Sequence, residues 1–219
     1  MSTSNLIDEM ISQAKLSKKH TAKQQKVVDA AIKIFAEKGF ANTSTSEIAE
    51  QAGVAEATIF RHYGTKENLL LSVILPFIKD FIPRMADEIF NGLLSQNPAT
   101  FEQFLRALIK NRIDFISDNR KLFQILVKEV MYREEFKQEL APLVSEIIIH
   151  HFNKVIETFK EREDLIDKPT PILIRMLLTF LYGYFTSRYV LITDNFVKNE
   201  EEEVDEVVRF IMGGLRKPV

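Results

Sequence analysis

The sequence predicts an all-α protein with a small N-terminal head and a larger helical body. Apolar residues recur near the helical period of about 3.6 along most of the chain, and no stretch alternates as a strand requires. Glycine and proline are scarce, with seven of each in 219 residues, which suits long helices. We expect an N-terminal arm over residues 1–20, a head over residues 21–68 and a body over residues 69–219.

The head is expected to begin with a single firm helix after a basic arm. Residues 1–20 contain one or two amphipathic turns followed by lysines, and they are expected to form the arm. The first helix is expected over residues 21–38, because apolar side chains four residues apart between Val27 and Phe35 form one stripe. Gly39 then ends the helix.

A short second helix is predicted after Thr43. The hydroxyl of Ser44 or Thr45 can cap it by accepting from a free backbone N–H, and Ile48 lies on its small apolar face. Gly53 is expected to end this helix in a left-handed conformation, which costs glycine least.

A third short helix is expected over residues 55–63. Ile59 and Tyr63 lie one turn apart on its apolar side. The other side carries small, polar and cationic side chains with one aromatic ring beside them, namely Ala57, Thr58, Phe60 and Arg61. A short helix, a glycine turn and a second helix with such an outer face suit the major groove of DNA. An ordinary helical hairpin of an all-α protein is the alternative.

Residues 30–70 as a whole resemble the N-terminal domain of the tetracycline-repressor-like (TetR/AcrR) family. The matching residues are Ala31, Phe35, Gly39, Phe40, Thr43, Ile48, Ala49, Ala52, Gly53, Val54, Ile59, Phe60, His62, Tyr63, Lys66, Glu67 and Leu70. The resemblance implies a helix-turn-helix head on a body that binds a ligand and dimerises. It further implies a transcriptional regulator, a repressor, that binds a palindromic operator in double-stranded DNA as a homodimer.

Carried over position by position, the resemblance implies a set of DNA contacts. These are Ser44, Thr45, Ala55, Glu56, Ala57, Thr58, Phe60, Arg61, His62 and Lys66. Ala57 and Thr58 would approach base edges, whereas His62 and Lys66 would approach phosphate oxygens. Glu56 departs from the family, which commonly has Lys or Arg there. Its carboxylate either costs a phosphate contact or accepts from a cytosine amine.

Three of these positions keep a second interpretation. Phe60 could pack in the core beside Ile59 instead of lining the groove, and His62 could serve the structure alone. Lys66 could be an ordinary surface lysine. Its place at a helix start after Thr65 favours a phosphate contact.

The body is expected to consist of six helices. Thr65 starts the first of them, which Pro76 and Pro83 should interrupt or kink because each ring removes a backbone donor. The other helices are expected over residues 99–117, 119–132, 135–162, 170–193 and 201–216. The last two are predicted to dimerise as a four-helix bundle, for which Gly183 allows close approach. The apolar stripe of the final helix is Val204, Val207, Val208, Ile211 and Leu215.

Aromatic residues are frequent in the body, and a phenylalanine stripe at helical spacing most often packs in a core. The alternative is a pocket for a small apolar or amphipathic effector. Its expected contacts are Phe81, Met85, Phe104, Tyr132, His151, Arg175 and Met176. A lone buried charge is costly, so Arg175 is expected to pair across an interface or to meet an anionic ligand. His151 has a second interpretation as a core histidine.

The charge distribution is polarised along the chain. The net charge is −2, and residues 1–68 carry nine Lys or Arg against eight Asp or Glu. Five lysines cluster over residues 15–26, while acidic residues gather over residues 200–206. This arrangement suits DNA at one end of the protein and repulsion at the other. A solvated helix start, where acids favour the dipole, also accounts for the acidic run.

Several classes of protein are disfavoured. The chain has no cysteine, which excludes disulfides, thiolate metal sites and a cysteine nucleophile and fits the cytoplasm. No signal peptide is visible, and Arg175 and Arg188 interrupt the longest apolar stretch, so no membrane span is expected. No phosphate loop, nucleophile elbow or HExxH motif supports an enzyme, a cofactor or a metal. A constitutive or architectural DNA-binding protein without an effector stays open.

Overall fold

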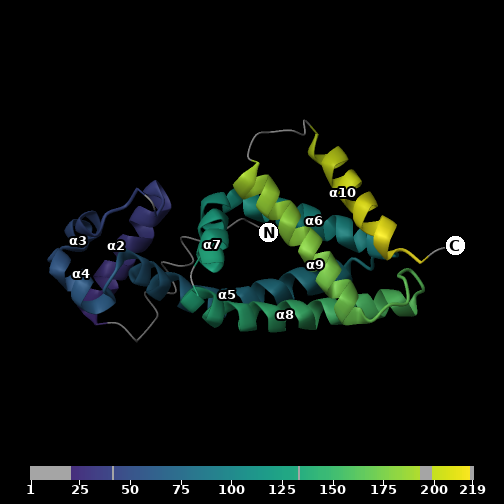
Figure 1. Cartoon of the computed structure of the whole chain (residues 1–219), viewed down its shortest axis with the longest axis horizontal. Helices are drawn as coiled ribbons and strands as arrows, with labels where there is room; N and C mark the ends of the chain where they lie inside the picture. The colour runs from purple at the N-terminus through teal and green to yellow at the C-terminus, as the bar shows by residue number, and fades with distance from the viewer. Residues whose placement is uncertain (1–20, 41, 133, 193–198, 218–219) are drawn as a thin grey trace. The chain divides into compact units, whose positions relative to one another are not determined.

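The computed structural model describes residues 21–217 except residues 41, 133 and 193–198, so the predicted arm lies outside the described residues. The described residues form α2 (Ala22–Lys38), α3 (Thr45–Ala52), α4 (Glu56–Tyr63), α5 (Lys66–Ser95), α6 (Phe101–Asp118), α7 (Arg120–Tyr132), α8 (Glu134–Glu161), α9 (Thr170–Thr186), the π-helix η1 (Ser187–Leu191) and α10 (Glu200–Leu215) (Figure 1). The predicted all-α class is confirmed.

The chain divides into two compact units. Among the described residues, unit 1 contains those up to residue 82 and those of 118–140, and unit 2 contains those of 83–117 and those from 141 onward. Helix α5 passes from one unit to the other at Pro83, and α8 does so one residue before Pro142. Helix α6 belongs to unit 2 except for its last residue, Asp118. These units are defined by packing alone. The functional division predicted at residue 68 therefore stays a prediction.

Local signals set the ends of α2 as predicted. Thr21 and Gln24 form a reciprocal capping box, in which Thr21 Oγ1 accepts from the Gln24 backbone at 3.3 Å and Gln24 Oε1 accepts from the Thr21 backbone at 2.9 Å. Gly39 ends the helix with φ of 78°, and its N–H donates to the carbonyl of Phe35. Val27 and Phe35 are buried, which confirms the predicted apolar stripe.

The long helices differ from the prediction at their prolines and at one end. Helix α5 runs unbroken through Pro76 and Pro83, so an interruption there is wrong, and the alternative of a kink stays a prediction. A proline removes one backbone donor, and the hydrogen bonds on either side can still hold a long helix together. The helix predicted over residues 170–193 instead ends at Thr186 and continues as η1.

Aromatic side chains form the core of unit 2. Phe101, Phe104 and Phe159 are completely buried, and the ring centroids of Phe101 and Phe159 lie 5.6 Å apart. Phe90 of α5 connects this group to α8, because its ring lies 6.1 Å from Phe104 and 5.1 Å from Phe152. These phenylalanines are thus core residues, as the more frequent case predicts.

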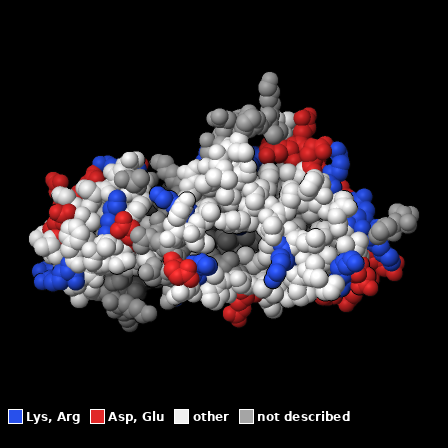
Figure 2. Space-filling model, viewed as in Figure 1, with Lys and Arg blue, Asp and Glu red and all other residues white. Residues whose placement is uncertain are grey.

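The acidic start of α10 is paired with cations of the same unit. Figure 2 shows red side chains over this end of α10. The pairs are Arg106 with Asp205, Lys110 with Glu201, and Arg188 with Glu200 and Glu203. Lys110 lowers the pKa of Glu201 through a hydrogen bond and its charge. These acids thus help to attach α10 to α6 and η1, and repulsion of DNA stays a prediction.

The turn at Gly53 gives a direct test of the head. Gly53 has φ of 66° and ψ of 39°, and an added Cβ would meet no atom within 4 Å. Gly53→Ala should therefore lower the free energy of unfolding by about 1–2 kcal/mol through backbone strain alone. Urea unfolding measures this change.

Gly92 is the matched control, because it is exposed inside α5 and an added Cβ there also meets nothing within 4 Å. Gly92→Ala should raise the free energy of unfolding by about 0.5–1 kcal/mol. Equal effects of the two substitutions would contradict a left-handed turn at Gly53.

Candidate nucleic-acid interface

The candidate interface rests on two helices that are too short to be stable alone. Helices α3 and α4 have eight residues each, and isolated helices shorter than about 12 residues are marginal in water. Ile48 and Ile59 are completely buried, and α3 packs against both α2 and α4. Burial of this apolar side leaves the opposite side of α4 in solvent.

The exposed side of α4 contains most of the expected DNA contacts. Glu56, Ala57, Phe60, Arg61 and His62 are exposed, and Ala55 is exposed just before the helix. Phe60 is 49% exposed, so it does not take the alternative position in the core. Thr58 is half-buried. The helix thus presents short side chains at its start and an aromatic ring with basic groups further along.

The first turns of α3 and α4 lie next to each other. Ser44 caps α3, because its hydroxyl accepts from the backbone N–H of Glu47 at 3.1 Å. Thr45 Oγ1 donates to Glu56 Oε1 at 2.6 Å and so joins the two helix starts. Helix N-termini attract anions, and two of them together can hold the phosphates of a DNA backbone.

Lys66 lies in a place that its spacing did not predict. Its ammonium donates to the carbonyl oxygens of Phe40 at 2.9 Å and Thr43 at 2.7 Å, and it lies 4.4 Å from the centroid of the Phe40 ring. The side chain is half-buried and faces the turn between α2 and α3. This geometry favours a structural role and argues against the phosphate contact implied by the resemblance. The partners lie 26 and 23 residues away, so no local pattern could reveal them.

Arg61 differs from Lys66 in being exposed. It makes no hydrogen bond or ion pair with any residue that the structure describes. In Figure 2 a group of blue side chains lies over the α4 end of unit 1. An exposed guanidinium on α4 without such a partner can approach a phosphate without breaking another contact.

The predicted ligand contacts differ widely in burial, and they are divided between the two units. Phe104 is part of the buried aromatic core, Tyr132 of α7 is 80% exposed and Met176 of α9 is 61% exposed. Phe81 belongs to unit 1, whereas Met85 belongs to unit 2. Arg175 is exposed, so it is not a lone buried charge, and its pairing across an interface or with an anionic ligand stays a prediction.

His151 of α8 faces α5. Its ring stacks on Phe90 with centroids 4.7 Å apart, and its Nε2 lies 3.3 Å from Asp87 Oδ1. Burial lowers the pKa of His151, although Asp87 acts in the opposite direction. His151 also lines a surface hollow of about 330 Å³ together with Asp87, Glu146 and His150. Its predicted ligand role stays a prediction.

Metal ligation and membrane insertion find no support within the described ranges. There, no three His, Cys, Asp or Glu side chains gather closely enough to hold a metal ion. Nor does any described helix combine the length and the apolar character needed to cross a bilayer.

Comparisons with known proteins agree with this geometry. Residues 27–73 match the family described as bacterial regulatory proteins, tetR family. The fatty acid metabolism regulator protein of Bacillus subtilis is 29% identical over 136 residues, which cover 62% of this chain and 66% of that relative. The transcriptional repressor AcnR of Corynebacterium glutamicum is 25% identical over 202 residues, which cover 91% and 95% of the two chains.

Solved structures share the fold at lower identity. A putative TetR-family regulator from Mesorhizobium loti has a TM-score of 0.60 and 17% identity, and the match covers 89% of this chain and 97% of that one. The fatty acid degradation regulator FadR from Bacillus halodurans has a TM-score of 0.56 and 22% identity, with 92% and 100% covered.

The exposed helix after a left-handed glycine turn defines a helix-turn-helix DNA-binding protein. The relatives named here are regulators, and a relative from Rhodococcus jostii and the one from Corynebacterium glutamicum are named transcriptional repressors. The chain belongs to the TetR family of transcriptional regulators.

Lys66 and Arg61 should respond differently to removal of their charge. Lys66→Met removes the donor to two carbonyl oxygens, so it should lower the free energy of unfolding by about 1–3 kcal/mol and leave the salt dependence of DNA binding unchanged. Arg61→Met should leave stability unchanged and reduce the slope of log K against log salt by about one unit per half-site. Titrations at several salt concentrations measure both slopes. The reverse pattern would restore the phosphate role of Lys66.

Glu56 should weaken non-specific binding through repulsion of phosphate. Glu56→Gln keeps an acceptor for Thr45 and removes the negative charge, so affinity for random duplex DNA should rise, most at low salt where screening is least. Glu37→Gln removes the same charge from an exposed position of α2 and is the control. An equal gain from both substitutions would show only a change in net charge.

Proposed function

We propose that this protein is a ligand-responsive repressor that binds a palindromic operator as a homodimer. The exposed side of α4 carries this proposal, since it presents small, aromatic and basic side chains on a firmly packed support. One helix of eight residues contacts too few bases for useful specificity. Two copies related by a twofold axis would double the number of bases read.

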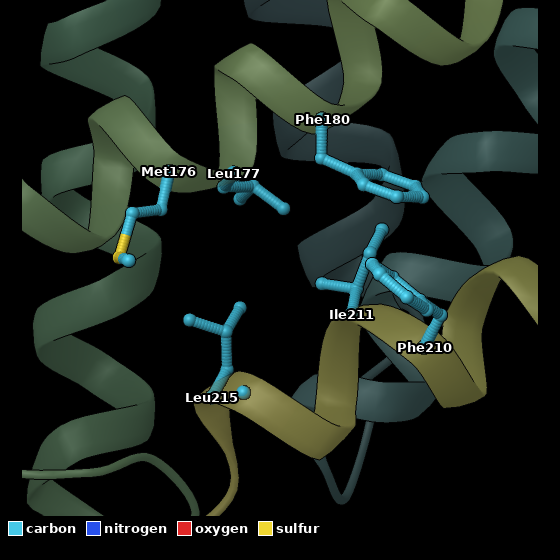
Figure 3. A pocket seen from close by; sticks show the side chains of 7 residues that line it. Met176, Leu177, Phe180, Phe210, Ile211 and Leu215 are labelled. Carbon is cyan, nitrogen blue, oxygen red and sulfur yellow. The ribbon is translucent and has the colours of Figure 1, made fainter.

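An exposed apolar face on α9 and α10 supports dimerisation. Ile172, Met176 and Tyr182 of α9 are 51%, 61% and 51% exposed, and Phe210 of α10 is 71% exposed. Phe180 and Phe210 stack with centroids 5.0 Å apart, beside a groove of about 170 Å³ (Figure 3). Exposed apolar patches of this kind mark contacts between proteins.

The dimer face differs from the stripe that the periodicity suggested. Val204, Val208, Ile211 and Leu215 are buried within this chain, and Val207 is half-buried. A stripe that already fills the core of its own unit cannot also form the contact with a second copy. The outward side of the same helix, with Phe210, takes that place in the proposed dimer.

The route for an effector signal starts in the body and runs through α5. This helix begins at Lys66, whose ammonium holds the carbonyls of Phe40 and Thr43 just before the Ser44 cap of α3. A shift of the first turn of α5 would therefore move the start of α3. To weaken operator affinity a hundredfold, the effector must favour the released state by about 2.7 kcal/mol.

An apolar or amphipathic effector fits the named relatives. One relative is named for fatty acid metabolism and one structural neighbour for fatty acid degradation, and a fatty acid is an amphipathic anion. A constitutive DNA-binding protein without an effector is the second candidate. This second candidate would be favoured if no small molecule tested changes the affinity for the operator. Action on DNA would place the protein in the cytoplasm.

Loss of the apolar face should abolish specific binding through loss of the dimer. Phe210→Glu places charge in the proposed contact, so the protein should sediment as a monomer and lose protection of its operator in footprinting. Wild-type protein should protect a site with twofold sequence symmetry.

Ile149→Glu is the matched control, because Ile149 is an exposed apolar residue of α8 at 44% exposure. It should leave the dimer and the footprint intact. A Phe210→Glu protein that remains dimeric would show that another face makes the contact. Protection of a site without twofold symmetry would refute the proposed mode of binding.

A further inference from the structure

Arg112 of α6 is a half-buried cation on an apolar surface of unit 2. Its Nη1 lies 3.6 Å from Met85 Sδ, and its guanidinium carbon lies 4.7 Å from the centroid of the Phe115 ring. Its remaining polar contact is to the neighbouring Asn111, whose Oδ1 accepts from Nε at 3.2 Å and from Nη2 at 2.6 Å. No carboxylate of the described residues pairs with it.

The other cations on the same helix are paired with acids. Arg106 pairs with Asp205 and Lys110 pairs with Glu201. Burial lowers the pKa of Arg112 to about 10, and no acidic group counters this effect. Arg112 therefore remains charged at neutral pH, although its surroundings disfavour the charge.

The guanidinium keeps hydrogen-bonding capacity at its outer end. It has five N–H groups, of which Nε and one on Nη2 serve Asn111, and a thioether such as Met85 is only a weak acceptor. The second N–H of Nη2 and a further one on Nη1 stay available to an oxyanion. Such a pair of parallel donors is the geometry that carboxylates and phosphates favour.

We propose that Arg112 binds the anionic head group of an amphipathic effector whose apolar chain packs beside Met85 and Phe115. A simple inorganic anion would gain little from these two apolar side chains and would lose its hydration. An anionic amphiphile suits both the unpaired cation and the apolar side chains beside it. Its oxyanion compensates the charge of Arg112, and its alkyl chain covers the apolar surface. This inference rests on the proposed ligand-responsive function and names the chemistry of its effector.

The shared chemistry is an anionic oxygen on a molecule that also has an alkyl chain. A free fatty acid supplies it as a carboxylate, and an acyl thioester of coenzyme A supplies it as a phosphate, because the thioester itself is neutral. The test measures binding of dodecanoate, dodecan-1-ol, dodecanoyl-coenzyme A and coenzyme A to the full-length protein by calorimetry. Arg112→Met should lower the affinity for the anion roughly ten- to hundredfold and should leave the affinity for dodecan-1-ol within about threefold of the wild-type value. The anion whose affinity falls in this way shows whether the effector is a free fatty acid or an acyl thioester. Coenzyme A alone should not bind.

Arg106→Met is the matched control, since it removes an arginine of the same helix that already has a carboxylate partner. It should leave the ratio of dodecanoate to dodecan-1-ol affinity unchanged. Thermal unfolding without ligand gives a second measurement. Arg112→Met should be at least as stable as wild type, because it removes an unpaired, partly desolvated charge. Lower stability would indicate that the contact with Phe115 is structural and would count against the inference.

The outcomes separate the inference from the proposed function. If amphiphiles release wild-type and Arg112→Met protein from the operator equally well, the proposed function stands and the role of Arg112 is wrong. If the anion binds through Arg112 and leaves operator affinity unchanged, the binding site stands and the proposed response is wrong. If none of the amphiphiles binds wild-type protein, or if Arg112→Met weakens the alcohol and the anion equally, the inference is refuted.

Discussion

Burial of Ile48 and Ile59 is the constraint on which the DNA-binding head depends. Two helices of eight residues cannot persist alone in water, so their existence requires that these side chains leave solvent against α2 and each other. The left-handed turn at Gly53 lets the chain reverse between them. Once this side is buried, the opposite side of α4 must face outward, and Phe60 and Arg61 become available to DNA.

Lys66 extends this constraint to the first turn of α5. Its ammonium lies over Phe40 and donates to two carbonyl oxygens of the turn between α2 and α3, which ties the beginning of α5 to the beginning of α3. The hydrogen bond from Thr45 to Glu56 continues the connection to α4. Coupling between ligand binding and DNA binding requires contacts that differ between two states, and this series of contacts is one place where such a difference could arise.

Charge pairing distinguishes the surfaces of unit 2. The cations Arg106, Lys110 and Arg188 are matched by acids of α10, so these charges hold the last helix in place. Arg112 has no such partner among the described residues and is partly desolvated. The apolar residues of α10 also fall into two groups, since Val204 and Val208 are buried within the chain whereas Phe210 is exposed. A ligand or a second copy of the chain gains the most binding free energy at unpaired charges and exposed apolar side chains, because one chain alone leaves them without a partner.

The sequence alone determined the all-α class and the limits of the three helices of the head, because caps, glycine turns and apolar periodicity act over a few residues. Thr21, Gly39 and Gly53 lie where those local rules place them. Tertiary structure alone decided the partners of Lys66 and the exposure of Arg175, as well as which side of α10 is buried. Periodicity shows that a helix has an apolar side, but which neighbour covers that side depends on contacts between residues far apart in the chain.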